Sequence, residues 1–267
     1  MFTRRGLAPP TGPFEVNYAS LQAHGLVVWW PPVVSVGTLV LQDIRALRPA
    51  PLYGNAVINP HPELGHVLAL DGTGDYAAPT AVGFGTVVGQ SRYTCSLWVS
   101  TTIPNTRQCV IADYSAAGAS QSFTIEIGGW QQTAAHITTQ VHNSQYLDSG
   151  VTAVANTLYH IAVTGSVPGN YAAIYINGVL ANSTTLASLE PGHTLAIGRG
   201  GAAVYLYVNG YIGDSRIYNR DMSADEVWQL YDPATRWELY EPTVRYWPVV
   251  VAPDFGLNPV FKPPNNF

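Results

Sequence analysis

Charged residues are scarce in this sequence. Only 11% of the 267 residues are Asp, Glu, Lys or Arg, and Lys262 is the one lysine. Globular domains usually carry about 25% charged residues, and long helical proteins need more of them. The formal net charge is −5 and no basic run occurs, which is unlike a nucleic-acid-binding surface. The composition therefore disfavours both a long helical protein and a nucleic-acid-binding protein.

Long apolar stretches are also missing. No run approaches the roughly 20 residues that span a bilayer. The N-terminus contains Arg4 and Arg5, but Pro9 and Pro10 follow where an export signal needs an apolar stretch. We therefore expect neither a membrane-spanning helix nor a signal peptide.

Cysteine is nearly absent, and the two that occur are Cys95 and Cys109. Both lie in strand-like runs that follow one another in the sequence. A hairpin turning near Asn105 would place Cys109 opposite position 100, too far from Cys95 for a disulfide. We therefore expect two free thiols, consistent with assembly in a reducing cytoplasm.

Glycine, proline and tyrosine are abundant instead, with 25, 20 and 16 residues. This composition suits short strands that are joined by tight turns. Many closely spaced strands with almost no helix predict an all-β sandwich or barrel. The strand-like runs are 66–70, 75–79, 92–101, 108–115, 121–127, 135–142, 158–164, 171–176, 179–184, 193–198 and 210–218.

Two local structures can be predicted closely. Asn177 and Gly178 stand between two strand-like runs, and both tolerate the positive φ angles of a two-residue hairpin turn. Ser223 and Glu226 have the spacing of a capping box, which predicts a short helix that begins there. We expect the apolar residues of this helix to pack on the sandwich.

The chain divides into three parts by composition. Residues 1–23 are predicted to be an N-terminal arm, residues 24–231 a single sandwich, and residues 232–267 a C-terminal arm rich in proline and aromatic residues. The predicted core includes the side chains of Trp29, Trp98, Ile161, Ile174 and Ile217.

Six stretches of the sequence resemble the laminin-G-like branch of the concanavalin A-like lectin/glucanase superfamily, and a seventh, Asp43–Arg45 followed by Tyr53–Ala56, resembles it in degraded form. The resemblance covers about residues 24–231 and implies a jelly-roll β-sandwich with one short C-terminal helix. The block at 213–227 is the most specific. The stretches are Gly25–Pro31 (GLVVWWP), Leu70–Tyr76 (LDGTGDY), Tyr93–Val99 (YTCSLWV), Tyr159–Thr164 (YHIAVT), Ile174–Gly178 (IYING) and Gly213–Val227 (GDSRIYNRDMSADEV).

A weaker resemblance concerns the two ends of the chain. The stretches 18–27 and 230–242 are similar to phage-encoded members of this superfamily. That resemblance implies a place in a virion, and it implies no chemistry.

Catalysis is not expected. Glycosidases of the superfamily carry paired carboxylates on one strand, and hydrolysis needs two carboxylates within about 5–9 Å. In the corresponding run 123–130, Glu126 stands without a second acid at neighbouring alternate positions. We interpret Glu126 as an exposed or hydrogen-bonded strand residue and predict that the protein is not an enzyme.

Asp71 and Asp75 leave two interpretations open. Many members of the superfamily hold calcium at a loop rim, and these carboxylates are suitable ligands. The same Asp-Gly-Thr-Gly-Asp stretch also suits a tight turn in which Asp binds its own backbone. The turn is the favoured interpretation, and no cofactor is expected unless calcium binds here. The seven histidines show no metal-site spacing.

A glycan site, if present, would use exposed aromatic side chains. Trp130 and Gln131 follow two glycines, and Tyr205 and Tyr207 share one strand face. Aromatic residues are equally expected at packing or subunit contacts. These four residues are therefore candidates for binding a cell-surface glycan or for a protein contact.

The sequence thus predicts a structural component of a bacteriophage particle, either a capsid decoration or cement protein or a tail-associated subunit. The alternative is a carbohydrate-binding lectin module for host adsorption. The expected partners are further copies in a homo-oligomer, such as a trimer, and other virion proteins, after assembly in the host cytoplasm. The predicted interface residues, in the C-terminal arm, are Trp237, Tyr240, Tyr246, Trp247, Phe255 and Phe261.

Overall fold

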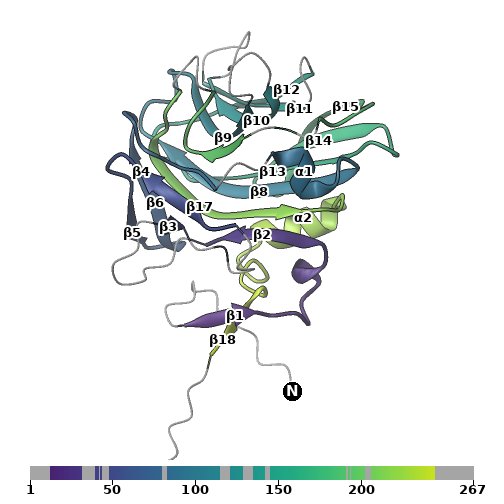
Figure 1. The fold of residues 1–267 in the computed structure, drawn as a ribbon, viewed down its shortest axis with the longest axis horizontal. Helices are drawn as coiled ribbons and strands as arrows, with labels where there is room; N and C mark the ends of the chain where they lie inside the picture. Colours follow the sequence, from purple (N-terminus) through teal and green to yellow (C-terminus); the bar gives the residue numbers. More distant parts are fainter. Residues whose placement is uncertain are drawn as a thin grey trace, which may run out of the picture.

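Two antiparallel sheets face each other in the computed structural model (Figure 1). The structure describes residues 13–31, 40–41, 43, 48–79, 83–114, 121–128, 135–141, 145–190, 192, 194–201 and 206–243. Within these ranges no helix is long and apolar enough to cross a membrane. The predicted all-β sandwich class is confirmed.

We call the two sheets sheet I and sheet II. Sheet I has the strand order β12-β11-β10-β9-β16-β7-β4-β3, and sheet II has the order β15-β14-β13-β8-β17-β6-β5, with β2 also paired to β17. The strands of sheet I are β3 (Val40–Leu41), β4 (Ala50–Tyr53), β7 (Tyr76–Ala77), β9 (Gln108–Tyr114), β10 (Gln121–Ile127), β11 (His136–Val141), β12 (Tyr146–Thr152) and β16 (Thr194–Ile197). Those of sheet II are β2 (Leu26–Trp30), β5 (Val57–His61), β6 (Gly65–Asp71), β8 (Arg92–Thr101), β13 (Tyr159–Ser166), β14 (Tyr171–Ile176), β15 (Val179–Thr184) and β17 (Asn209–Tyr218).

The main core lies between the sheets. Ile161, Ile174 and Ile217 are fully buried there, as predicted. The short helix α1 (Phe84–Val88) adds Phe84, whose ring stacks on Phe123 with 4.0 Å between the centroids. Such close aromatic packing fills the space between the sheets without polar atoms.

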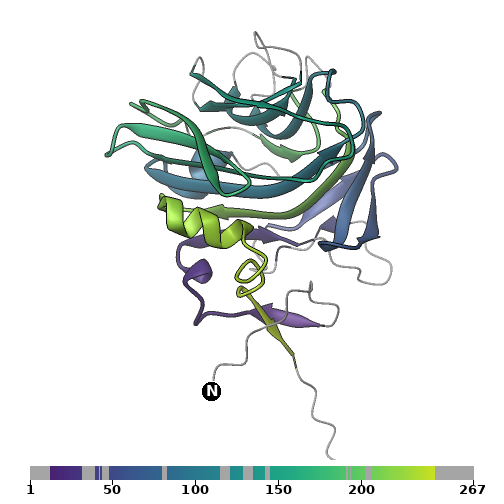
Figure 2. The ribbon, with the colours of Figure 1, turned by 180° about the vertical axis from the view of Figure 1, so that it is seen from behind.

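A third layer covers the outer face of sheet II (Figures 1 and 2). It consists of the 3-10 helix η1 (Leu21–Ala23), helix α2 (Ala224–Tyr231) and the strand pair β1 (Phe14–Val16) and β18 (Tyr240–Pro242). Trp29 and Trp98 are buried as predicted, but in this second apolar cluster, not between the sheets. Successive strand residues point to opposite faces: Leu97 points between the sheets and Trp98 points outward.

Parts of the two predicted arms pack on the sandwich and on each other. Val16 pairs with Tyr240 in the β1–β18 ladder, so segments from both ends of the chain form one small sheet. Trp237 and Tyr240 were predicted to contact a partner, and in this chain both side chains are buried in the third layer. The partner contact itself stays a prediction. The other four predicted interface residues, Tyr246, Trp247, Phe255 and Phe261, lie outside the described residues.

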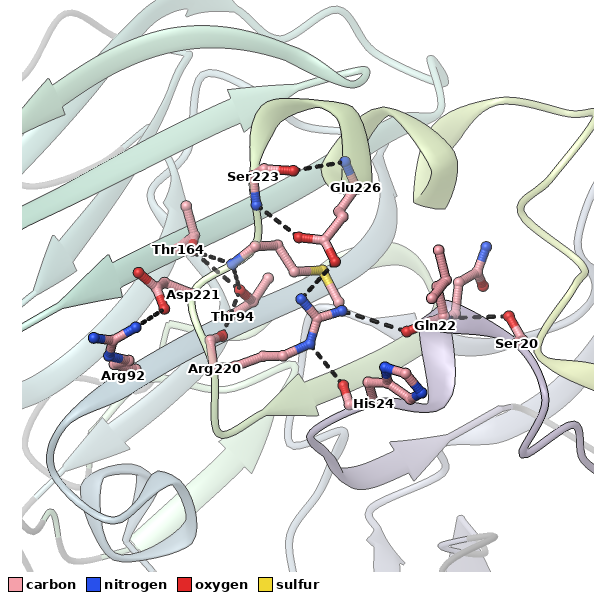
Figure 3. Close-up of polar contacts among 12 residues, drawn as sticks. Ser20, Gln22, His24, Arg92, Thr94, Thr164, Arg220, Asp221, Ser223 and Glu226 are labelled. Atoms are coloured by element: carbon pink, nitrogen blue, oxygen red, sulfur yellow. Dashed lines mark hydrogen bonds and ion pairs between the residues drawn. The ribbon is translucent and has the colours of Figure 1, made fainter.

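Polar contacts fix the third layer to sheet II (Figure 3). The predicted capping box is confirmed: Glu226 N donates to Ser223 Oγ (3.3 Å), and Ser223 N donates to Glu226 Oε2 (3.0 Å). Arg220 Nη1 donates to Glu226 Oε1 (2.7 Å), and Arg220 Nε donates to the carbonyl of His24 (2.7 Å). Met222 N donates to the hydroxyl oxygen of Thr94 (3.0 Å), a residue of β8. The helix is therefore bound to both sheet II and the N-terminal segment.

The hairpin prediction is also confirmed. Asn177 and Gly178 have φ angles of 51° and 77°, and Ile176 pairs with Val179 across the turn. Both φ angles lie in the left-handed region that a type I′ turn requires.

The two cysteines are free, as predicted, and buried. The predicted hairpin between them is wrong, because β8 with Cys95 belongs to sheet II and β9 with Cys109 belongs to sheet I. Burial raises the pKa of the Cys109 thiol, and the nearby Glu126 carboxylate acts in the same direction. Both effects favour the unreactive neutral thiol.

Trp98→Ala should lower the free energy of unfolding by about 3–5 kcal/mol, because it opens a large cavity under the third layer. Trp228→Ala is the matched control: this side chain is 45% exposed and its loss should cost less than about 1.5 kcal/mol. Urea unfolding of both variants measures the difference. Equal effects of the two substitutions would contradict the described third layer.

Candidate functional site

A polar pocket of about 230 Å³ opens at one end of sheet II. It lies where the β4–β5 turn, the β6–β7 turn and the first residues of β17 meet. The lining residues that matter chemically are Asn55, Asn59, Asp71, Thr102, Asn209 and Tyr211. These residues are far apart in the sequence, and the sheet brings them together.

Asp75 builds the turn on which the pocket depends. Its carboxylate is buried and accepts hydrogen bonds from Asn55 N (2.7 Å) and from Asp71 N (3.1 Å). Gly54, with φ +71°, lies so close that a Cβ atom would collide with the Asp75 carboxylate. Asp75 therefore joins the β4–β5 turn to the β6–β7 turn.

Asp71 presents an exposed carboxylate at the rim of the pocket. Its Oδ1 accepts from Thr73 N (2.7 Å) and its Oδ2 accepts from Asn55 Nδ2 (3.1 Å). The hydrogen bond from Asn55 and then the one from Thr73 N lower the pKa of the Asp71 carboxyl below its usual value. Asp71 is therefore ionised at neutral pH and can accept further hydrogen bonds.

Asn209 forms the opposite wall of the pocket. Its Nδ2 donates to the backbone carbonyl of Asp71 (2.9 Å), and its Oδ1 accepts from the hydroxyl of Thr102 (2.6 Å). An amide nitrogen has two hydrogens, so one N–H of Asn209 is not used in these contacts. The Asn59 side chain is exposed on β5.

An aromatic side chain borders these polar groups. Val57, Ala69 and Tyr211 are in register across β5, β6 and β17, so they share one face of sheet II. Tyr211 is 39% exposed, and its ring packs on that of His61 in a T-shaped arrangement with 6.2 Å between the centroids. Burial lowers the pKa of His61, so this neighbour is neutral at pH 7.

The two candidate calcium ligands, Asp71 and Asp75, do come together in this pocket. Their contacts are those of the turn interpretation, because each carboxylate accepts backbone N–H groups within the loop. Among the residues that the structure describes, no group of three or more His, Cys, Asp or Glu could hold a metal ion.

The aromatic candidates from the sequence lie elsewhere. Trp130, Gln131 and Tyr205 fall outside the described residues. Tyr207 lies near Tyr76 of sheet I, with 6.4 Å between the ring centroids. Tyr207 does not line the pocket, so the sequence-based choice of aromatic residues missed Tyr211.

The sequence also missed the amides of Asn55, Asn59 and Asn209. A weak signal existed for one of them: Asn209 immediately precedes Gly210 at the start of a predicted strand. Asn residues in turns are common in all-β proteins, so this signal alone does not separate a binding residue from a turn residue.

Glu126 is hydrogen-bonded, one of the two predicted environments, but it is buried and not exposed. Both carboxylate oxygens accept from Arg107, at 2.8 Å from Nε and 2.9 Å from Nη2. The Cys109 thiol also lies 3.4 Å from Oε1. This pairing satisfies a buried charge and leaves the carboxylate little capacity for chemistry.

A buried Ser–His pair is present in sheet II. Ser96 Oγ and His160 Nε2 are 2.8 Å apart, under the rings of Trp98 and Tyr231. Burial, with smaller effects from the cationic Arg216 and Arg236, lowers the pKa of His160 to about 3. Because both residues are buried, the pair is closed to a substrate.

Comparison with known families identifies this fold. Residues 71–228, more than half of the chain, match the family described as the concanavalin A-like lectin/glucanases superfamily. The chain belongs to this family. The resemblance seen in the sequence is thereby confirmed at the level of the superfamily and its sandwich fold.

Solved structures of the same fold come from proteins of different size. Domain 4 of AbnA, a GH43 extracellular arabinanase from Geobacillus stearothermophilus solved in complex with arabinotriose, is 16% identical, with a TM-score of 0.62 over 78% of this chain and 98% of that chain. Trypanosoma rangeli sialidase is 17% identical, with a TM-score of 0.60 over 78% of this chain and 32% of that chain. At these identities the likeness concerns the fold alone.

A third structure is the receptor binding domain of botulinum neurotoxin C/D mosaic serotype, 16% identical, with a TM-score of 0.59 over 78% of this chain and 51% of that chain. The present chain thus spans about a third of the sialidase and about half of the toxin domain. No curated protein sequence matches the chain.

Asp75→Ala should lower the free energy of unfolding by about 2 kcal/mol, because two backbone N–H groups lose their buried acceptor. Asp225→Ala is the control, since Asp225 is exposed in the first turn of α2 and its loss should cost less than about 1 kcal/mol. Denaturant unfolding measures both values. A cost for Asp75→Ala no larger than the control would show that Asp75 does not hold the two turns together.

Proposed function

We propose that this protein is a carbohydrate-binding module that binds its ligand in the pocket of Asp71, Asn209 and Tyr211 and does not cleave it. The observation that carries the proposal is the combination of polar groups in one pocket. A carboxylate accepts hydroxyl hydrogens, amides donate and accept, and an aromatic side chain offers an apolar surface to a sugar ring.

The state of the two carboxylates supports binding over hydrolysis. A glycosidase needs one carboxyl group that holds a proton and a second that acts as nucleophile or base. The pKa of Asp71 is lowered, which favours its ionised form. Asp71 is therefore not suited to be a general acid. Asp75 is buried and both of its oxygens accept backbone N–H groups, so it is not available to a substrate.

The comparisons support the same proposal at a coarser level. The family includes lectins by its description, and domain 4 of AbnA was solved in complex with arabinotriose. The toxin structure is described as a receptor binding domain. A sandwich of this kind therefore serves recognition in other proteins, and we extend that role to this chain.

A place in a bacteriophage particle stays a prediction, as do the homo-oligomer and the virion partners.

One observation favours a module that is attached to a larger assembly through its third layer. Thr243 N donates to the carbonyl of Pro13 (2.9 Å), so both described chain ends lie together on the third layer. Antibody labelling of purified particles from a host that expresses the chain tests this placement.

Tyr211→Ala should weaken carbohydrate binding by about tenfold or more, as expected when a large aromatic side chain that packs on a ligand is removed. Tyr18→Ala is the matched control, because Tyr18 is 67% exposed on the third layer and outside the pocket. A glycan array identifies a ligand for the wild type, and calorimetric titration compares the variants. Equal binding by Tyr211→Ala and the wild type would place the site elsewhere.

A further inference from the structure

We propose that the pocket selects neutral saccharides over acidic ones and holds them without a metal ion, with Asp71 as the selecting residue. This inference rests on the proposed carbohydrate-binding function and specifies its ligand class. It depends on three features of the pocket: its charge, its remaining hydrogen-bonding capacity and the contacts of Asp75.

The pocket carries a negative charge, and no cationic side chain among its described lining residues neutralises it. Asp71 contributes an ionised carboxylate at the rim, and none of the described residues that line the pocket is Lys, Arg or His. The neighbouring His61 has a lowered pKa and adds no positive charge at pH 7. A sugar carboxylate at about 4 Å from Asp71 would be repelled enough to weaken binding by about fivefold or more.

The remaining hydrogen-bonding capacity also fits neutral sugars. Each carboxylate oxygen accepts about two hydrogen bonds. Asp71 Oδ1 and Oδ2 each accept one from the protein, from Thr73 N and Asn55 Nδ2. This exposed carboxylate therefore keeps acceptor capacity, which suits sugar hydroxyls. An ionised sugar carboxylate has no hydrogen to donate there.

The contacts of Asp75 make a bridging metal unnecessary. Both of its oxygens accept backbone N–H groups, from Asn55 and Asp71. A cation bound between Asp71 and Asp75 would compete with these two partly buried hydrogen bonds. The turn is already held by them, so the sugar can reach Asp71 directly.

The test uses the full chain and pairs of related sugars, one neutral and one acidic. Suitable pairs are galactobiose with digalacturonic acid, and lactose with sialyllactose, and arabinotriose serves as a further neutral probe. Titrations are run in low and high salt, with and without EDTA, on the wild type, Asp71→Asn and the control Asp225→Asn. Asp225 is an exposed carboxylate on α2.

The wild type and Asp225→Asn should prefer the neutral member of each bound pair by about fivefold or more at low salt. The preference should shrink at high salt, where charges are screened. Asp71→Asn should bind the neutral sugar about tenfold more weakly and lose the preference, because it removes both the charge and a strong acceptor. EDTA should leave every affinity unchanged.

Three results would overturn the inference, and they differ from failure of the function itself. Equal or tighter binding of the acidic sugar, or an unchanged preference in Asp71→Asn, would remove the charge selection. Loss of binding in EDTA would remove the metal-free mode. In each of these cases Tyr211→Ala still reports whether the pocket binds sugar. A wild type that binds no member of a full glycan array would overturn the proposed function and the inference together.

Discussion

The buried ion pair between Arg216 and Asp214 is the contact on which the layered structure depends. Arg216 Nη2 lies 2.6 Å from Asp214 Oδ2, and both residues are buried on β17. Asp214 Oδ1 also accepts from Trp29 Nε1 (2.7 Å) and from the Tyr240 hydroxyl (3.1 Å). Arg216 Nη1 reaches the side-chain oxygen of Gln22 (2.8 Å). One ion pair thus joins sheet II to segments from both ends of the chain, and removing either partner would leave a buried charge unpaired.

Strand β17 contributes both to the contact with the third layer and to the pocket, through different residues. The register of β17 shifts between Gly213 and Arg216, so the strand is irregular where it carries the ion pair. Its first residues, Asn209–Tyr211, lie before this irregularity and line the pocket. The third layer therefore anchors one half of β17, and the other half presents polar and aromatic side chains to solvent. A binding site on a strand that is fixed in this way is held more rigidly than one on a free loop.

Local patterns predicted the parts of the fold that depend on neighbours in sequence. The bounds of β8, β10, β14 and β15 are those of the strand-like runs, and the capping box at Ser223 follows from two residues three positions apart. Two of the strands that the list of strand-like runs missed have weak local patterns: β5 contains Pro60, and β12 contains Gly150. The third layer and the pocket depend on contacts between residues far apart, such as Gln22 with Arg216, or Asp71 with Asn209. The hydrophobic periodicity of a single sequence carries no information on such contacts. Asp71 and Asp75 could be predicted to lie together because they belong to one short motif, whereas the amides of Asn55, Asn59 and Asn209 come from distant segments and were missed.

Backbone amide shifts of isotope-labelled protein, followed by NMR during titration with a neutral oligosaccharide, test the location of the site most directly. The changes should gather at residues 55–59, 71–75 and 209–211, which belong to three segments that meet at one pocket. Changes centred on Tyr207 and the nearby Tyr76 of sheet I, or around the sequence-predicted candidate Trp130, would contradict the proposed pocket.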